Sequence, residues 1–302
     1  MNDTRCWGIY RELAHSPGRE TDDAEILRAV AKELEARGFA VELKSTDELE
    51  ADPETSGSGA GGDPVPNVFV MCERPAIVER LAAWERRGAR IVNRPSGIRN
   101  TDRERTIALF ARHSVPFPHS VLVDTATGPE SFRGPCWVKR GDVHATQEGD
   151  VSYAEGPDDL AERLSILAER GITRAVVQDH APGDLIKFYG VAGLPEAEAE
   201  ENGAAPAPAG PPRPSWFQWF YHRDQTLHRY GFDEDALAAA ASLAASALGL
   251  DVYGGDAIVS PEGALCIIDL NAWPSFALFR EVASKRIAAL LAARFSRRMV
   301  AR

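Results

Sequence analysis

The chain of 302 residues contains little cysteine. Its four cysteines, Cys6, Cys72, Cys136 and Cys266, lie far apart, each in or beside an apolar stretch. None has the short spacing of a zinc knuckle, and scattered cysteines make no disulfide framework. We therefore expect all four to be small core residues.

Long apolar runs are absent as well. No run reaches the roughly 18 residues needed to cross a bilayer, and the N-terminus has no secretory signal pattern. We expect a soluble, cytoplasmic protein without a membrane partner. A hydrophobic content of 44% over this length predicts a substantial core divided between two or three lobes.

Dense basic clusters are also missing. Lys and Arg number 34 against 45 Asp and Glu, which gives a formal net charge of -11. No cluster of positive charge can follow a phosphate backbone, so we expect no nucleic-acid partner and a small-molecule substrate instead. The composition carries no signal for an oligomeric state.

Strand and helix patterns alternate through residues 1–98. Strands are expected at 5–10, 39–43, 67–72 and 90–93, and helices with apolar residues at helical spacing at 22–37 and 76–88. This alternation predicts an α/β lobe with a parallel sheet.

Two further lobes are expected at 99–183 and 184–302. The first should contain helices at 101–113 and 157–171 and strands at 119–124, 136–140 and 174–178. The second should contain strands at 185–192 and 216–222, separated by a low-complexity insert, 194–214, that we expect to be disordered. The predicted fold class is α/β with α+β lobes.

A hairpin near the C-terminus carries three oxygen-bearing side chains, Asp256, Asp269 and Asn271. Ser260 to Gly263 suit a type I turn between two antiparallel strands. If Ser260 faces Gly263, Asp256 is a diagonal neighbour of Asp269, and Asn271 lies on the same face. Two carboxylates and an amide suit Mg²⁺ or Mn²⁺.

The alternative is a surface hairpin whose acids merely face water. Ile267 and Ile268 point to opposite sides of the second strand, which indicates burial. An unpaired carboxylate would be costly there. We therefore favour the metal site, although a register slip of one residue would separate the two acids.

The order of several motifs resembles the nucleotide site of the ATP-grasp superfamily over roughly residues 90–295. These motifs are Lys139, the run 176–180, the turn 182–184, Lys187 and the acidic hairpin. The resemblance implies an N-terminal parallel-sheet lobe followed by two lobes that clasp ATP, with Mg²⁺ or Mn²⁺ held against the phosphates.

The resemblance also assigns roles. Lys139, Lys187 and Arg103 would contact phosphates, Asp184 the ribose, and Gln178, Asp179 and the backbone of His180 the adenine. Each has an ordinary alternative: a strand-end lysine, a turn aspartate, a charge on a helix surface. Lys187 is the least ordinary, because a lysine on an apolar strand needs an anionic partner if it points inward.

Two stretches resemble inositol polyphosphate 5/6-kinases. Residues 139–146, KRGDVHAT, are similar to the Lys-x4-His-Gly-Thr stretch of these kinases, and residues 268–274, IDLNAWP, to their Ile-Asp-x-Asn-Ala-Phe-Pro. The resemblance makes His144 the candidate that orients the acceptor or stabilises the transferring phosphoryl group. Arg103, His144 and Lys187 are thus the expected catalytic residues.

The acceptor site is less defined. Residues 10–23 are mixed in charge and lack the lysine pair of these kinases. Arg11, His15 and Arg19 lie before a helix, where they could grip an anion. The alternative is a capping loop with Thr21 or Asp22 as the N-cap.

Three functions are compatible with these residues. The favoured one is a kinase that transfers the γ-phosphoryl group of ATP to a hydroxylated, inositol phosphate-like acceptor. The alternative is a carboxylate-amine or carboxylate-thiol ligase that works through an acyl phosphate. Such a ligase needs an oxyanion donor, and Gly254 stands where several ligases place an arginine. The third function is an inactive nucleotide-binding regulator. The two metal-binding acids on one hairpin argue against it, because a pure binding protein does not need them.

Overall fold

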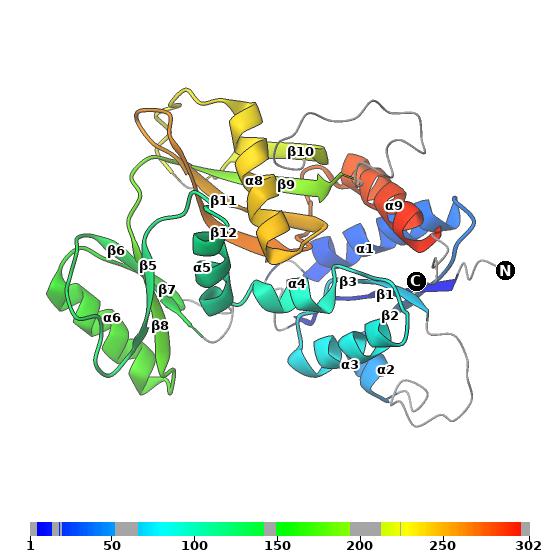
Figure 1. Ribbon diagram of the computed structural model, residues 1–302, viewed down its shortest axis with the longest axis horizontal. Helices are drawn as coiled ribbons and strands as arrows, with labels where there is room; N and C mark the ends of the chain where they lie inside the picture. Colours follow the sequence, from blue (N-terminus) through cyan, green and yellow to red (C-terminus); the bar gives the residue numbers. More distant parts are fainter. Residues whose placement is uncertain are drawn as a thin grey trace.

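The computed structural model describes residues 5–13, 18, 20–51, 66–141, 149–193, 213–223 and 225–296. Within these residues the strands form three sheets of four strands each. Figure 1 shows the N-terminal sheet (blue and cyan) and the central sheet (green) at opposite ends of the molecule. The C-terminal sheet lies between and above them in this view. The domain limits given above stay a prediction.

The N-terminal sheet is parallel, as the alternating pattern predicts. Its order is β2-β1-β3-β4. The strands are β1 (Arg5–Ile9), β2 (Ala40–Lys44), β3 (Asn67–Val70) and β4 (Ile91–Val92), and the helices are α1 (Glu20–Glu35), α2 (Thr46–Ala51), α3 (Pro75–Arg86) and α4 (Pro95–Asn100).

The central sheet is antiparallel, with the order β5-β8-β6-β7. Its elements are α5 (Arg103–Arg112), β5 (Ser120–Asp124), β6 (Cys136–Arg140), β7 (Val151–Ala154), α6 (Pro157–Glu169) and β8 (Arg174–Asp179). Side chains alternate along β6. Cys136 and Val138 are buried in the cluster that contains the leucines of α6, whereas Trp137 and Lys139 point to the other face.

The C-terminal sheet is also antiparallel, with the order β10-β9-β11-β12. Its strands are β9 (Asp184–Ala192), β10 (Pro214–Tyr221), β11 (Val252–Val259) and β12 (Leu265–Ala272). Of the insert predicted at 194–214, only Arg213 and Pro214 are among the described residues. Pro214 begins β10, so the predicted disorder is wrong there.

The hairpin β11–β12 differs from its predicted register. Ser260 pairs with Ala264 rather than Gly263, because Gly263 adopts a φ of 80° and lengthens the turn by one residue. A second irregularity follows at Ile268, which has no partner between the pairs Ala257–Ile267 and Asp256–Asp269. The two acids are therefore directly opposite each other, and the predicted diagonal relation is wrong.

The bulge at Ile268 is what puts both carboxylates on one face. Continued without a bulge, the pairing near the turn would set Asp256 opposite Ile268 and Asp269 opposite Gly255. Asp269 would then point to the far side of the sheet. The extra residue shifts the register by one and restores the shared face that the sequence predicts.

Four helices were not expected from the sequence: α2, α4, α8 (Glu234–Leu248) and α9 (Arg280–Ser296). Helix α8 does carry sequence signals. The Asp233 carboxylate caps it by accepting from the amides of Asp235 and Ala236, and Gly249 ends it with a φ of 78°. Helix α9 packs against α1, so the two ends of the described chain lie together (Figure 1).

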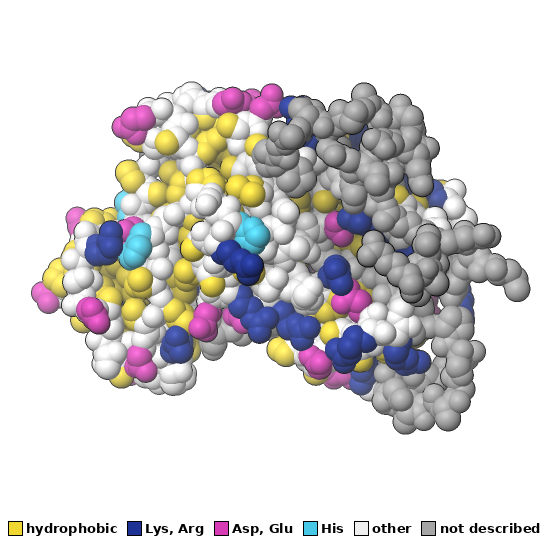
Figure 2. Space-filling model, viewed as in Figure 1, with side chains coloured by type: hydrophobic (Ala, Val, Ile, Leu, Met, Phe, Trp, Pro, Cys, Tyr) yellow, Lys and Arg dark blue, Asp and Glu magenta, His cyan; other side chains and the backbone are white. Residues whose placement is uncertain are grey.

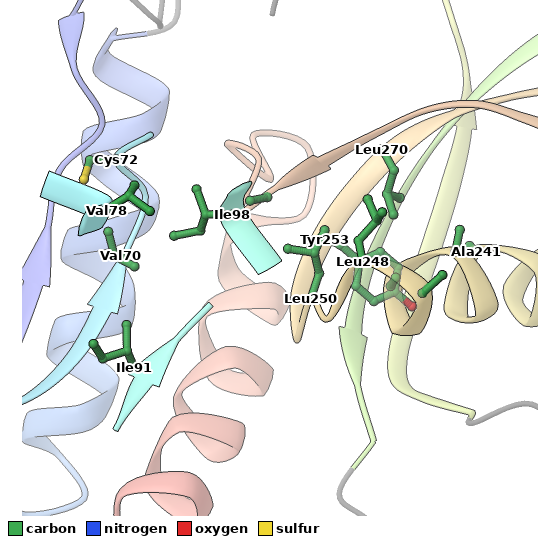
Figure 3. Close-up of a cluster of buried hydrophobic side chains, with 14 of the residues drawn as sticks. Val70, Cys72, Val78, Ile91, Ile98, Ala241, Leu248, Leu250, Tyr253 and Leu270 are labelled. Carbon is green, nitrogen blue, oxygen red and sulfur yellow. The ribbon is translucent and has the colours of Figure 1, made fainter. Parts of the chain in front are cut away.

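One buried cluster joins the N-terminal and C-terminal lobes. Ile98 of α4 lies between Val70 and Val78 on one side and Leu248 and Leu250 on the other (Figure 3). Its side chain is 4% exposed. Three of the cysteines are buried and Cys266 is partly buried, which confirms the predicted core role for those three. In the described ranges, no helix is long and apolar enough to span a membrane.

Replacing Ile98 with alanine should therefore loosen the contact between these lobes. We expect a loss of about 2–5 kcal/mol in the free energy of unfolding, because a buried isoleucine leaves a cavity. Urea denaturation followed by circular dichroism measures it. The control, Ile166→Ala on the partly exposed face of α6, should cost no more than about 1 kcal/mol. Equal losses in both variants would contradict the role of Ile98.

Candidate functional site

A single cleft of about 990 Å³ runs between the three lobes. At one end it is lined by Trp137, His180 and Leu185, and at the other by Val78 and Arg99. Most of the predicted site residues that the structure describes line it: Arg103, Lys139, Gln178, Asp179, His180, Asp256, Asp269 and Asn271. The cleft therefore brings strand residues of the central and C-terminal sheets together with helix and loop residues of the N-terminal lobe.

The middle of the site is a row of charged side chains across three strands. Lys187 of β9 lies opposite Asp256 of β11, which lies opposite Asp269 of β12. The Lys187 Nζ atom is 2.8 Å from the Asp256 Oδ1 atom. Asn271 follows on the same face, and its Nδ2 atom donates to Asp269 Oδ2 at 3.2 Å. Lys187 has the anionic partner that an inward lysine needs, and this partner is a carboxylate.

Electrostatics make this row receptive to a cation. Burial raises the pKa of Asp256, and the nearby Asp269 raises it further, whereas Lys187 and Lys139 oppose both effects. Two facing carboxylates repel each other unless a positive charge lies between or beside them. Among the described residues, no group of three or more His, Cys, Asp or Glu side chains forms a metal site. The candidate set, two carboxylates and an amide, would fill only part of the coordination of Mg²⁺. Magnesium sites in proteins usually take their remaining oxygen ligands from water and substrate phosphates.

Lys139 connects the central sheet to this row. Its Nζ atom donates to the carbonyl oxygen of Ile268 at 3.3 Å. Ile268 is the residue that the bulge leaves unpaired. Burial lowers the pKa of Lys139, and the nearby Arg103 lowers it further, whereas Asp269 and Asp256 raise it. Arg103 lies beside it at the start of α5 and donates to the carbonyl oxygen of Arg140. Lys139 and Arg103, two of the three cations predicted to contact phosphates, therefore lie together.

An aromatic surface occupies one end of the cleft. The rings of Trp137 and Tyr153 are 5.3 Å apart, and Tyr153 and His180 are 5.4 Å apart. Trp137 is 36% exposed and lines the cleft two residues before Lys139. We did not predict Trp137, although its spacing from Lys139 places both on one strand face.

The residues predicted to contact adenine line the cleft, and two of them already make hydrogen bonds within the protein. The backbone N–H of His180 donates to the carbonyl oxygen of Pro135 at 2.9 Å, so it is already engaged within the protein. The amide of Gln178 donates to Ser120 Oγ at 3.2 Å. Asp179 faces His119 and Arg133, at 3.6 and 3.7 Å. These residues border the cleft, but their donors mainly hold the wall in place.

The predicted ribose role of Asp184 is wrong. Its side chain is fully buried and absent from the cleft wall. The carboxylate accepts from the backbone amides of His228 and Tyr230, at 2.9 and 3.1 Å. Asp184 thus fixes the segment before α8. The sequence of a Pro-Gly-Asp turn does not predict this structural role.

Arg11 does not have the predicted role of gripping an anion. Its guanidinium contacts Glu73 at 2.7 Å and Asp23 at 3.3 Å. It also donates to the carbonyl oxygens of Ala272 and Trp273, at 3.1 and 2.8 Å. Arg11 therefore ties the N-terminal lobe to the end of β12. The other predicted acceptor residues, His15, Arg19 and His144, lie outside the described residues.

The far end of the cleft has cationic side chains that we did not predict as site residues. Arg99 and Arg105 line it together with Arg103, and Arg99 pairs with Glu79 at 2.8 Å. Figure 2 shows a band of Lys and Arg side chains over α5, α4 and α3 on this face, although the chain as a whole is acidic. The sequence does concentrate arginine here, with seven from Arg86 to Arg105, but it does not show which of them face the cleft.

Replacing Asp184 with asparagine tests its structural role. We expect a loss of about 2–3 kcal/mol in the free energy of unfolding at neutral pH, because a charged acceptor of two buried amides is removed. Burial opposes ionisation, but the amides of His228 and Tyr230 outweigh it and lower the pKa below the ordinary 3.8. The stabilisation is complete above that ordinary value and is lost as pH falls through the lowered pKa.

Urea denaturation at several pH values measures this effect, and the difference between wild type and variant should shrink below a pH of about 4. Asp179→Asn, at a partly exposed carboxylate on the cleft wall, is the control and should cost little stability. Weaker ATP binding by Asp184→Asn with unchanged stability would restore the ribose role.

Comparison with known proteins bears on the fold. No family model and no curated protein match the sequence. Solved structures do match. A RimK domain ATP-grasp protein from Sphaerobacter thermophilus DSM 20745 has a TM-score of 0.61 at 18% identity, covering 97% of this chain and 99% of that one. The ATP-grasp ligase PsnB, solved with a minimal precursor, Mg and ADP, has a TM-score of 0.63 at 18% identity, covering 98% of both chains.

D-alanine–D-alanine ligase from Bacillus anthracis, complexed with ATP, has a TM-score of 0.63 at 11% identity, covering 97% of both chains. Identities this low establish the fold alone. The expected similarity to inositol polyphosphate kinases is not shown by these neighbours, two of which are ligases by name. Over nearly its full length, the chain has the ATP-grasp fold.

Proposed function

We propose that this protein is an ATP-dependent ligase that activates a carboxylic acid as an acyl phosphate and joins it to an amine or a thiol. The observation that carries the proposal is the Lys187–Asp256–Asp269 row, whose two carboxylates line one cleft. An aromatic arm opens on one side of the row and an arginine-lined arm on the other.

The aromatic arm suits a nucleotide base. Trp137 offers a ring face, and Leu185, Ile258 and Ile268 add apolar walls. Lys139 and Arg103 lie between this arm and the acidic row, where the phosphates of ATP would extend. A nucleotide ligand is supported by the B. anthracis D-alanine–D-alanine ligase, which shares the fold and was solved with ATP.

Asp256, Asp269 and Asn271 fit a divalent cation, since all three offer oxygen donors on one sheet face. These residues would hold Mg²⁺, which would supply positive charge to offset the charge that develops during phosphoryl transfer. Lys187 and Lys139 supply further positive charge, and no side-chain nucleophile is required.

The arginine-lined arm favours an acid as the acceptor. Arg99 and Arg105 can receive a carboxylate, while Val78 and Ile98 provide apolar surface in the same cleft. The same arm contains Glu73 and Glu79, which would repel an acceptor crowded with phosphates. This mixed charge supports the ligase over the kinase that the motif around His144 favours. The neighbouring ligases support the same choice.

The test is product analysis. Purified protein is incubated with MgATP and two pools, one of amino acids and Asp- or Glu-containing dipeptides, the other of polyols and inositol phosphates. We expect ADP and free phosphate in equal amounts with the first pool. Phosphate retained on a polyol would establish the kinase. ATP binding without turnover in either pool would establish the regulator.

Asp269→Asn should reduce turnover at least about 100-fold, because one metal-binding carboxylate is lost. Glu262→Gln, at the exposed tip of the same hairpin, should leave turnover unchanged. Full activity in Asp269→Asn would contradict the role of the acidic row in metal binding.

Trp137 gives a separate test of the nucleotide arm. Trp137→Ala should raise the Kd for MgATP about tenfold or more, because stacking on a base is worth roughly 1–3 kcal/mol. Trp137→Phe should keep most of the affinity. Isothermal titration calorimetry measures both variants, and equal affinity in wild type and Trp137→Ala would place the base elsewhere.

A further inference from the structure

The segment that follows β12 is held in an uncommon backbone conformation. Trp273 and Phe276 have φ angles of 42° and 52°, values that bulky residues rarely adopt. Contacts on both sides hold them. The Trp273 amide donates to the carbonyl oxygen of Val252 at 3.0 Å, and Arg11 donates to the carbonyl of Trp273. The segment 273–276 is therefore a fixed wall of the cleft.

This wall fills the space beside the acidic row. A Cβ atom at Gly254 would lie 2.6 Å from Pro274 Cγ and 2.8 Å from a ring carbon of Tyr189. No side chain at position 254 can therefore reach the cleft. The 273–276 segment, which lines the cleft through Pro274 and Ser275, occupies that space instead.

Ser275 offers such a donor. It lines the cleft and is 4% exposed, and its hydroxyl has no hydrogen-bond partner among the described residues. An unpaired buried hydroxyl costs stability and is uncommon in native structures. A serine hydroxyl can turn between three staggered positions, so its direction can adapt to a ligand.

Neighbouring donors are already engaged. Asn271 Nδ2 donates to Asp269, and Lys187 pairs with Asp256. The guanidinium of Arg11 is shared between two carboxylates and two carbonyl oxygens. On this wall the Nε1 atom of Trp273 also has no partner among the described residues, but Trp273 is fully buried and does not line the cleft. The Ser275 hydroxyl is therefore the unpaired donor of this wall that lines the cleft.

We infer that Ser275 Oγ donates a hydrogen bond to the carbonyl oxygen of the reacting carboxyl group. The inference rests on the proposed ligase function. After the carboxylate takes the γ-phosphoryl group and ADP leaves, the amine nitrogen attacks the acyl carbon. The carbonyl oxygen becomes an oxyanion, and the hydrogen bond from Ser275 strengthens with its charge. The C–O bond to phosphate then breaks, inorganic phosphate leaves, and the amine proton passes to water.

The test compares Ser275→Ala with Ser284→Ala. Ser284 is an equally buried serine on α9, but its hydroxyl donates to the carbonyl oxygen of Glu281 at 3.1 Å. The probe is MgATP with the amino acid and dipeptide pool, with hydroxylamine as the nucleophile. Hydroxamate formation measures the acyl transfer, thermal unfolding measures stability, and calorimetry measures MgADP affinity.

We expect opposite patterns in the two variants. Ser275→Ala should lower hydroxamate formation roughly 100-fold, keep MgADP affinity, and leave the Tm unchanged or higher. Ser284→Ala should keep full activity and lose about 2 °C in Tm, because a satisfied hydrogen bond is removed.

The outcomes separate the two proposals. Full activity in Ser275→Ala beside an active wild type overturns the role of Ser275 and leaves the ligase function standing. A lower Tm in Ser275→Ala that accounts for its loss of activity also overturns the role, because the hydroxyl is then structural. A wild type that binds MgADP but forms neither hydroxamate nor free phosphate overturns the ligase function and the inference together.

Discussion

The bulge at Ile268 sets the geometry on which the site depends. One unpaired residue in β12 turns Asp269 to the same face as Asp256, and Asn271 follows because side chains two apart share a face. The bulge has a second effect. It frees the Ile268 carbonyl oxygen from the strand ladder, and Lys139 of the central sheet donates to that oxygen. A single irregularity thus aligns the acids and attaches the opposite wall of the cleft.

The balance of charge around Asp256 and Asp269 then determines which ligand these aligned carboxylates can bind. Two facing, partly buried carboxylates are unfavourable alone, and Lys187 offsets only part of that cost because it pairs with Asp256. A divalent cation with its phosphates would complete the balance. The order of charges across the cleft, from Arg103 and Lys139 to the acidic row, is therefore already arranged for a metal-bound anion before any ligand arrives.

The sequence predicts this site where local patterns carry the information. Alternating apolar runs predict the parallel N-terminal sheet, and the spacing of Asp269 and Asn271 predicts a shared face. The register of the hairpin was not predictable, because it depends on the φ angle of Gly263 and on a bulge that no residue type marks. Two departures from a simple ladder, one at the turn and one at Ile268, preserved the predicted face while changing the pairing.

Tertiary demands explain the remaining differences. Asp184 has the sequence setting of a turn residue, but the fold needs its carboxylate to hold two amides far along the chain. Arg11 was predicted as an anion-binding residue because it lies in a loop after β1. In the structure it is surrounded by Glu73, Asp23 and two carbonyl oxygens. Apart from Asp23, the partners of these two side chains lie 44 or more residues away in sequence, too far for a local pattern to indicate them.

The position of Arg11 has a consequence for how the lobes cooperate. The Arg11 guanidinium donates to the carbonyl oxygens of the two residues directly after Asn271. It also pairs with the carboxylates of Asp23 and Glu73, which belong to the N-terminal lobe. A change in the N-terminal lobe that moves these carboxylates must also move Arg11. Movement of Arg11 in turn loosens a segment whose backbone is costly to hold. Arg11 therefore connects carboxylates of the N-terminal lobe to the backbone that follows Asn271. Under the proposed function, this contact would link the arm that receives the acceptor to the residues that would hold the metal.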